Sequence, residues 1–160
     1  MGKWYDTFKE YLDNEYKGPF IATDIIIEYN DGNKDGIVLI DRKNIPYGLA
    51  LPGGIAEHIT FEENAVKEAK EETGLEVILR TPNRPFCVFS DPEQDPRAFI
   101  AAVVYIAEGY GTFDPHPEED ARSAKIYSLD ELRGLLDSDG LVYTHHRKIL
   151  EMYLDHRNTK

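Results

Sequence analysis

Three glutamates in one short stretch are the residues of this sequence with the clearest chemistry. Glu68, Glu71 and Glu72 recur at i, i+3 and i+4, so a helix through them would place all three carboxylates on one face. Like charges at this spacing destabilise a helix by roughly 0.2–0.5 kcal/mol per pair. Mg²⁺ or Mn²⁺ would offset the repulsion, because hard divalent cations prefer several oxygen ligands. The alternative is a solvated acidic face that Lys67 and Lys70 neutralise in part.

The segments around the glutamates predict the helix that would carry them. Thr60 and Glu63 fit a capping box, and Gly74 stands where a helix favours a left-handed residue, so we expect a helix over 61–73. Pro52-Gly53-Gly54 predicts a break before it. The apolar positions of the helix suit a face packed on a sheet, which leaves the glutamate face toward a cleft: Phe61, Ala65, Val66 and Ala69.

The overall composition excludes several classes of protein. The 160-residue chain holds 18 Lys and Arg against 30 Asp and Glu, so its net charge is −12, and its isoelectric point is about 4.8. Such a charge opposes binding to nucleic acid or to an anionic membrane, both of which need a basic face. The single cysteine, Cys87, excludes an internal disulfide and a Cys-rich zinc site. No apolar run approaches the roughly 20 residues that span a bilayer, and the N-terminus lacks an apolar signal region, so we expect a cytoplasmic protein.

The chain as a whole predicts a single domain, 1–160, with an N-terminal helix in 1–17, a core in 18–137 and a C-terminal helix in 138–160. We expect strands at 20–29, 37–41, 75–79, 85–90, 98–107 and 124–128, and further helices at 3–15, 129–136 and 144–156. The most continuous apolar strand, 98–107, is expected to be central. Strands mixed with a few helices, without regular β-α alternation, predict an α+β fold or an α/β/α sandwich.

Residues 53–75 resemble the Nudix box, in which a Gly, five residues, a Glu and seven residues precede Arg-Glu-apolar-x-Glu-Glu-x-Gly-apolar. The positions that match without a gap are Gly53, Glu68, Ala69, Glu71, Glu72, Gly74 and Leu75. The resemblance implies an α/β/α sandwich with a mixed central sheet. It also implies Glu68 and Glu72 as the first metal ligands, and Glu71 as a third ligand or as the group that orients metal-bound water. A backbone carbonyl of Gly53 or Gly54 would contribute as well.

Two positions depart from the box. Ile59 replaces its first Glu, which in the family braces the turn between loop and helix, and Lys67 replaces its Arg, which orients a metal-binding Glu. If Gly54 took the place of the box Gly, the loop would be one residue short. Glu57 could then cover part of the role of the missing first Glu. Lysine supplies charge without the planar pair of donors of arginine. We therefore expect a metal site that is retained but less preorganised.

Two further segments resemble functional parts of the family. Glu118-Glu119-Asp120 occupies the loop before the last strand, where such enzymes often carry another carboxylate, so Glu119 is the candidate general base and Glu118 the near alternative. The alternative interpretation is an exposed acidic loop. Residues 89–97 resemble a Ser-Asp-Pro segment of ADP-ribose pyrophosphatases, which makes Ser90, Asp91 and above all Arg97 candidates for substrate contact. The alternative here is a rigid surface turn with Arg97 in a local ion pair.

The resemblance implies a metal-dependent hydrolase, with Mg²⁺ or Mn²⁺, that splits ADP-ribose into AMP and ribose 5-phosphate. Two alternatives remain: a Nudix hydrolase of a nucleoside triphosphate or dinucleoside polyphosphate, and a weakened Nudix domain that binds a nucleotide or a protein. By analogy we expect a homodimer, to which the aromatic N-terminal helix would contribute. The five histidines show no convincing metal-ligand spacing, and His145 and His146 are expected on a helix surface.

Overall fold

The two longest apolar stretches of the sequence form neighbouring inner strands of one sheet. β1 (Phe20–Asn30) and β7 (Ile100–Tyr110) run parallel, from Phe20 opposite Ile100 to Glu28 opposite Glu108. Both strands are buried over most of their length, which explains apolar runs in place of alternation. The predicted central position of the 98–107 strand is confirmed, because β7 pairs with β1 on one edge and with β5 and β6 on the other.

The computed structural model describes residues 3–159, so the two ends of the predicted 1–160 domain lie outside the described residues. The other strands are β2 (Asp35–Arg42), β3 (Gly48–Ala50), β4 (Gly53–Ile55), β5 (Glu76–Leu79), β6 (Cys87–Phe89) and β8 (Ala121–Tyr127). The sheet has the order β3-β2-β1-β7-β5, with β4 on β1, β6 on β7 and β8 on β2. Each of these further pairs is antiparallel, so the sheet is mixed.

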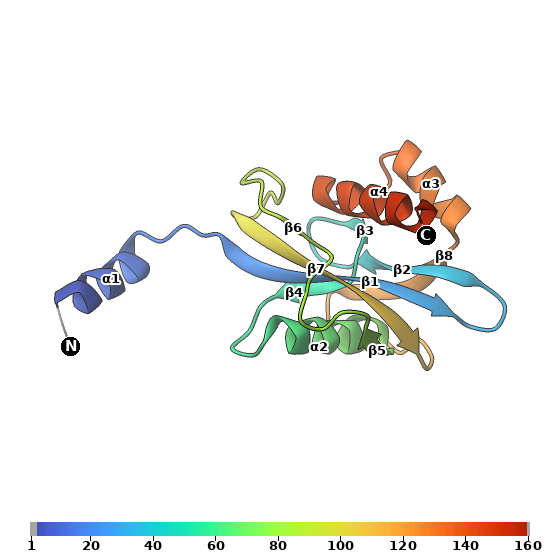
Figure 1. Cartoon of the computed structure of the whole chain (residues 1–160), viewed down its shortest axis with the longest axis horizontal. Helices are drawn as coiled ribbons and strands as arrows, with labels where there is room; N and C mark the ends of the chain where they lie inside the picture. The colour runs from blue at the N-terminus through green and yellow to red at the C-terminus, as the bar shows by residue number, and fades with distance from the viewer. Residues whose placement is uncertain (1–2, 160) are drawn as a thin grey trace.

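Helices cover both faces of this sheet (Figure 1). α2 (Phe61–Thr73) lies on one face, and α3 (Leu129–Asp137) and α4 (Thr144–Asn158) lie on the other. Ala65 and Ala69 of α2 belong to one apolar cluster, and Leu132 of α3 and Leu150 of α4 belong to a second. The predicted α+β fold, an α/β/α sandwich with a mixed central sheet, is confirmed. In residues 3–159, no helix combines the length and the apolar character that crossing a bilayer requires.

The N-terminal helix α1 (Lys3–Asn14) stands apart from the sandwich (Figure 1). The helix was expected from its spacing of apolar residues, but those side chains are not buried against the sheet. Trp4 is 74% exposed, and it stacks on Phe8 of the same helix with ring centroids 5.2 Å apart. Phe8, Tyr11 and Leu12 are exposed as well.

One local prediction was incomplete. Pro52-Gly53-Gly54 is a break in the sequence pattern, yet Gly53 and Gly54 begin the short strand β4, which pairs with β1 opposite Asp24 and Thr23. The pairing uses backbone groups alone, and glycine has no side chain that could indicate a strand, so the sequence gives no signal for it. As a result the loop is fixed to the sheet beside α2.

Candidate functional site

The glutamates of α2 are positioned by both ends of the helix. Thr60 and Glu63 form the predicted capping box, with the Thr60 side chain accepting from the Glu63 N–H. Gly74 ends the helix in the left-handed region at a φ of 80°, and a Cβ at this position would collide with the backbone of Asp114. Gly74 is therefore required twice, by its conformation and by the close approach of another segment.

That segment carries the predicted acidic loop to the glutamates. The Asp114 N–H donates to the Thr73 carbonyl, and the His116 N–H donates to the Glu71 carbonyl at 2.7 Å. These bonds tie the loop before β8 to the last turn of α2. Glu119 is brought to the glutamates in this way, although it lies 47 positions or more away from them in the sequence.

Carboxylate oxygens of Glu68, Glu71 and Glu119 lie within 4.8 Å of one another. Glu72 is held beside them, since its carboxylate accepts the Gly53 N–H at 2.8 Å. The loop comes equally close at Gly54, where a Cβ would lie 2.5 Å from the carboxyl carbon of Glu68. We call Glu68, Glu71, Glu72 and Glu119 the glutamate cluster.

The glutamate cluster concentrates negative charge in a poorly solvated place. Burial is the main cause that raises the pKa of Glu68 to about 7, and the charges of Glu71 and Glu119 add to it while Lys67 opposes it. Burial also raises the pKa of Glu72 well above its usual range, against the effect of the Gly53 N–H. In the absence of a cation, Glu68 is therefore partly protonated near neutral pH, and burial favours the protonated form of Glu72.

Among the ion pairs of the described residues, Lys67 is the one cation that contacts these glutamates. Its Nζ lies 2.8 Å from Glu71, 2.9 Å from Glu57 and 3.9 Å from Glu68. Hydrogen bonds to Glu71 and Glu57 raise the pKa of Lys67 above its ordinary value. Lys67 thus contacts the predicted ligand Glu71, as the box Arg is expected to do, with a single ammonium shared among three carboxylates.

The turn before α2 is held without the box's first glutamate. Ile59 is 41% exposed. The Glu57 N–H donates to Oδ1 of Asn64, and Nδ2 of Asn64 donates to the buried hydroxyl of Thr23 at 2.8 Å. Asn64 is completely buried. It supplies a brace from α2 to both the loop and β1, which the sequence analysis missed.

A pocket of about 250 Å³ opens beside the glutamate cluster. Part of its lining comes from Gly53, Gly54, Glu68, Glu72 and Glu119. Most of its other polar lining comes from a set of residues that we call the histidine cluster: Asp24, Arg42, Asp95, Arg97, Asp120, Tyr143, His145 and His146. The pocket therefore joins two polar groups of different chemistry.

Asp24 is the centre of the histidine cluster, and the sequence analysis did not identify it. It is a buried carboxylate in the middle of the apolar strand β1, and its Oδ2 lies 3.4 Å from Nε2 of His146 and 3.7 Å from Nε2 of His145. Burial opposes its ionisation, but the two imidazoles that face it lower the pKa of Asp24 below its usual range. A charged residue inside an apolar run was the signal that could have found it.

The predicted surface position of His145 and His146 was wrong. They are 5% and 2% exposed, because the first turn of α4 is inserted into the pocket wall. Nδ1 of His146 accepts the Leu51 N–H at 3.1 Å, so its proton sits on Nε2, toward Asp24. Burial also lowers the pKa of His146. A nitrogen that carries a proton cannot bind a metal, so Asp24, His145 and His146 do not make a three-ligand metal site, although their ligand atoms are close together.

The arginines of the histidine cluster are both paired. Arg42 contacts Asp120 at 2.5 Å. Arg97 binds Asp95 with two nitrogens, Nε at 3.0 Å and Nη2 at 2.8 Å. Both guanidinium carbons lie over the ring of Tyr143, at 5.4 and 5.5 Å from its centroid. Arg97 thus has the local ion pair of the alternative interpretation and also lines the pocket.

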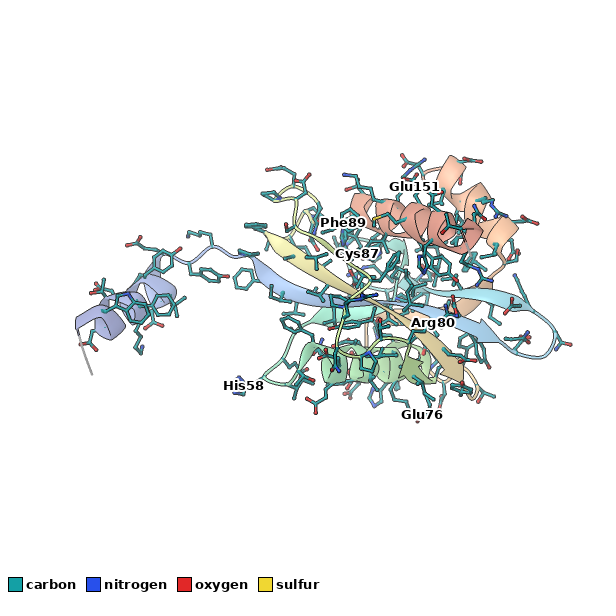
Figure 2. The ribbon with its side chains drawn as sticks, in the orientation of Figure 1. His58, Glu76, Arg80, Cys87, Phe89 and Glu151 are labelled. Atoms are coloured by element: carbon teal, nitrogen blue, oxygen red, sulfur yellow. The ribbon has the colours of Figure 1, made fainter. Side chains whose placement is uncertain are left out.

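Four predicted site residues are not part of the pocket lining: Glu71, Ser90, Asp91 and Glu118. The Asp91 carboxylate accepts the Glu93 N–H, and Glu118 is exposed. Gln94, which replaces an Arg of the similar segment, is buried and donates to the carbonyls of Phe89 and Ile100. It closes the loop that presents Arg97. His58 lies at the outer end of the loop before α2, away from the sheet (Figure 2).

The glutamate cluster fits a hard divalent cation. Its donors are oxygens only, and three of them converge within 4.8 Å. The negative charge of these buried carboxylates is only partly neutralised by one shared lysine, Lys67. Oxygen donors without nitrogen or sulfur favour Mg²⁺ or Mn²⁺ over softer metals.

Comparisons with known proteins identify the family and the fold of the chain. Residues 19–152 match the NUDIX domain family. The chain is 36% identical over 146 residues to the ADP-ribose pyrophosphatase of Methanocaldococcus jannaschii, an alignment that covers 89% of this chain and 78% of the relative. A NUDIX hydrolase structure from Nitrosomonas europaea has a TM-score of 0.72 at 19% identity, covering 91% of this chain and 75% of that one. The NUDIX domain of Shewanella oneidensis NrtR, solved with ADP ribose, has a TM-score of 0.71 at 17% identity, covering 98% and 99%. The last two comparisons show a shared fold.

Proposed function

Because the chain belongs to the NUDIX family and is a Nudix pyrophosphohydrolase, we propose that it hydrolyses ADP-ribose to AMP and ribose 5-phosphate with Mg²⁺ or Mn²⁺. The observation that carries the proposal is the convergence of Glu68, Glu71 and Glu119 beside the pocket. The ADP-ribose pyrophosphatase of M. jannaschii, at 36% identity, supports the choice of substrate.

The glutamate cluster would hold the cation. Glu68, Glu72 and a carbonyl of Gly53 or Gly54 are the proposed first ligands, and Glu71 is a third ligand or orients the attacking water. A bound divalent cation would supply charge neutralisation of the pyrophosphate and activation of water. Gly53 keeps Glu72 in place through its N–H, so the loop and the helix are positioned as one unit.

The remaining roles fall to residues at the pocket edge. Glu119 is the proposed general base, because its carboxylate faces Glu68 and Glu71 and it lines the pocket, whereas Glu118 does not. It would accept a proton from the water that attacks one phosphorus, while the bridging oxygen leaves with the other phosphate. Arg97 would donate to a phosphate oxygen with the N–H groups that Asp95 does not use. Ser90 and Asp91 stay as predicted substrate contacts that depend on the same loop.

An assay of the purified chain tests the function. ADP-ribose is incubated with Mg²⁺ or Mn²⁺, and AMP and ribose 5-phosphate are quantified, with a metal-free sample and Glu72→Gln as controls. Release of both products only in the presence of metal supports the proposal. Turnover of a nucleoside triphosphate or a dinucleoside polyphosphate with ADP-ribose inert would change the substrate. Thermal stabilisation by a nucleotide without any product would favour a binding domain.

The exposed aromatic face of α1 supports the proposed homodimer. Trp4, Phe8, Tyr11 and Leu12 are too exposed to be explained by packing within one chain. We expect sedimentation equilibrium to give a dimer mass for the full chain. Phe8→Glu combined with Leu12→Glu should shift it to a monomer, and a dimer that persists in this variant would place the interface elsewhere.

A further inference from the structure

Two side chains of the pocket lining have a buried polar atom without a partner. The hydroxyl of Tyr143 and Nδ1 of His145 make no hydrogen bond with any described residue. Tyr143 and His145 are each 5% exposed, and both line the pocket. Buried polar groups nearly always find a partner, because leaving one unpaired is costly. The two atoms are therefore candidates to bind a ligand group.

The pocket is suited to only one half of a dinucleotide-sized substrate. Its volume is about 250 Å³, below the roughly 300–1,000 Å³ of pockets that enclose a whole drug-sized ligand. The single aromatic ring in its lining other than the imidazoles, that of Tyr143, is packed against Arg42, Arg97 and the ring of His146, whose centroid is 4.9 Å away. This ring is thus already covered by the protein's own groups and does not offer a stacking surface to a nucleobase.

The donors and acceptors of the histidine cluster match a sugar. His145 directs Nε2 toward the Asp24 carboxylate, so the proton of a neutral imidazole sits there and Nδ1 is an acceptor for a hydroxyl. The Tyr143 hydroxyl can both donate and accept. Beside them, Arg97 keeps N–H groups that are suited to a phosphate oxygen. Hydroxyls next to a phosphate are the chemistry of a phosphorylated sugar.

We infer that Tyr143 and His145 form the subsite for the non-nucleoside sugar of the substrate, with the nucleoside outside this pocket. The enzyme then selects a nucleoside diphosphate linked to a sugar over one linked to a small alkyl group or to a second phosphate. This inference rests on the proposed function and names the groups that would set its substrate class.

The decisive variant is Tyr143→Phe, which removes one hydroxyl and keeps the ring between the two arginines. We expect kcat/KM for ADP-ribose to fall about tenfold, equivalent to about 1.4 kcal/mol. For the β-methyl ester of ADP, which has the same pyrophosphate and no sugar, kcat/KM should change less than twofold. Equal losses on both substrates, or no loss on ADP-ribose, would overturn the subsite.

Thermal unfolding gives a second readout, because the loss of this buried hydroxyl is not expected to lower Tm. Since the Tyr143 hydroxyl is buried without a partner, Tyr143→Phe should leave Tm unchanged or raise it. The matched control is Tyr153→Phe on α4, which lies outside the pocket lining and loses a 2.6 Å hydrogen bond to Glu28. The control should lower Tm and leave kcat/KM for ADP-ribose unchanged. A lower Tm in Tyr143→Phe would mean that its hydroxyl has a structural role.

A binding measurement separates failure of the subsite from failure of the proposed function. Ribose 5-phosphate at millimolar concentration should raise the Tm of the unaltered chain, and Tyr143→Phe should abolish that rise. If ADP-ribose is not hydrolysed but this pattern is seen, the proposed substrate fails and the sugar subsite stands. If ADP-ribose is hydrolysed and ribose 5-phosphate gives no rise in the unaltered chain, the subsite is refuted while the function holds.

Discussion

The glutamate cluster buries more negative charge than its neighbours neutralise, whereas the histidine cluster pairs nearly every charge that it contains. Glu68 and Glu72 have raised pKa values, and Lys67, the cation that contacts Glu68, is shared with Glu57. In the histidine cluster, by contrast, Arg42 is paired with Asp120 and Arg97 with Asp95. A buried charge without a partner reduces stability unless a ligand is bound. The charge of the first cluster suits the divalent cation that we propose, whereas the paired charges of the second hold its shape around the proposed sugar subsite.

The largest expected effect comes from removing one charge of the glutamate cluster. Glu72→Gln keeps an oxygen that can accept the Gly53 N–H but removes a carboxylate ligand, so we expect kcat/KM to fall on the order of a thousandfold. The metal-free variant should be at least as stable as the parent chain, because a crowded buried acid is lost. Glu76→Gln is the control, since Glu76 pairs with Lys70 away from the pocket (Figure 2). Unchanged turnover by Glu72→Gln would remove Glu72 from the metal site.

A comparison within the acidic loop gives the next largest effect. Glu119→Gln should lower kcat about a hundredfold, as expected for loss of a general base. Glu118→Gln should change kcat less than threefold, because Glu118 is outside the pocket lining. The reverse result would assign the base to Glu118.

Substitution in the histidine cluster should affect the stability of the fold more than the activity, the opposite of what we expect for Glu72→Gln. Asp24→Asn replaces the carboxylate that both imidazoles face, so we expect the free energy of unfolding to fall by about 1–3 kcal/mol, and kcat/KM to fall less than tenfold. Chemical denaturation with parallel kinetics measures both. An activity loss as large as that of Glu72→Gln would mean that the two clusters share the chemistry.

The pH dependence of stability should reveal the raised pKa of Glu68 in the glutamate cluster. Folding raises the pKa of Glu68 from 4.5 to about 7, so the folded state binds more protons and loses stability as pH rises through this window. Metal-free Glu68→Gln should therefore gain stability over the parent chain between pH 5 and 8, on the order of 2 kcal/mol, or roughly 2–4 °C in Tm for each kcal/mol. Saturating Mn²⁺ should remove the gain. A difference that does not depend on pH would refute the raised pKa.

Local chemistry made much of the fold predictable. The helix 61–73 was predicted with its bounds, because Thr60, Glu63 and Gly74 act on the backbone within a few residues of themselves. The apolar runs that became β1 and β7 were equally clear. The glutamate cluster was predicted in part, since i, i+3 and i+4 spacing is a property of one helix.

The histidine cluster could not be predicted in the same way. Asp24 lies on β1, whereas Tyr143 and His145 lie at the start of α4, and these two elements meet only through tertiary packing. A pair of adjacent histidines at a helix start looks like surface when the segment is considered alone. The register of β4 against β1, which brings Gly53 beside Asp24, is also a property of the folded sheet.

The docking of the loop onto the end of α2 makes the site sensitive to insertions. An extra non-glycine residue between Thr73 and Gly74 would occupy the position that Gly74 now holds, and its Cβ would collide with the backbone of Asp114. Glu68, Glu71 and Glu72 would keep their places on α2, while the Asp114 segment, which donates to the Thr73 carbonyl, would have to move away. The insertion would thereby separate Glu119 from the other three glutamates without replacing any existing residue. The helix length is therefore as much a part of the site as its residues.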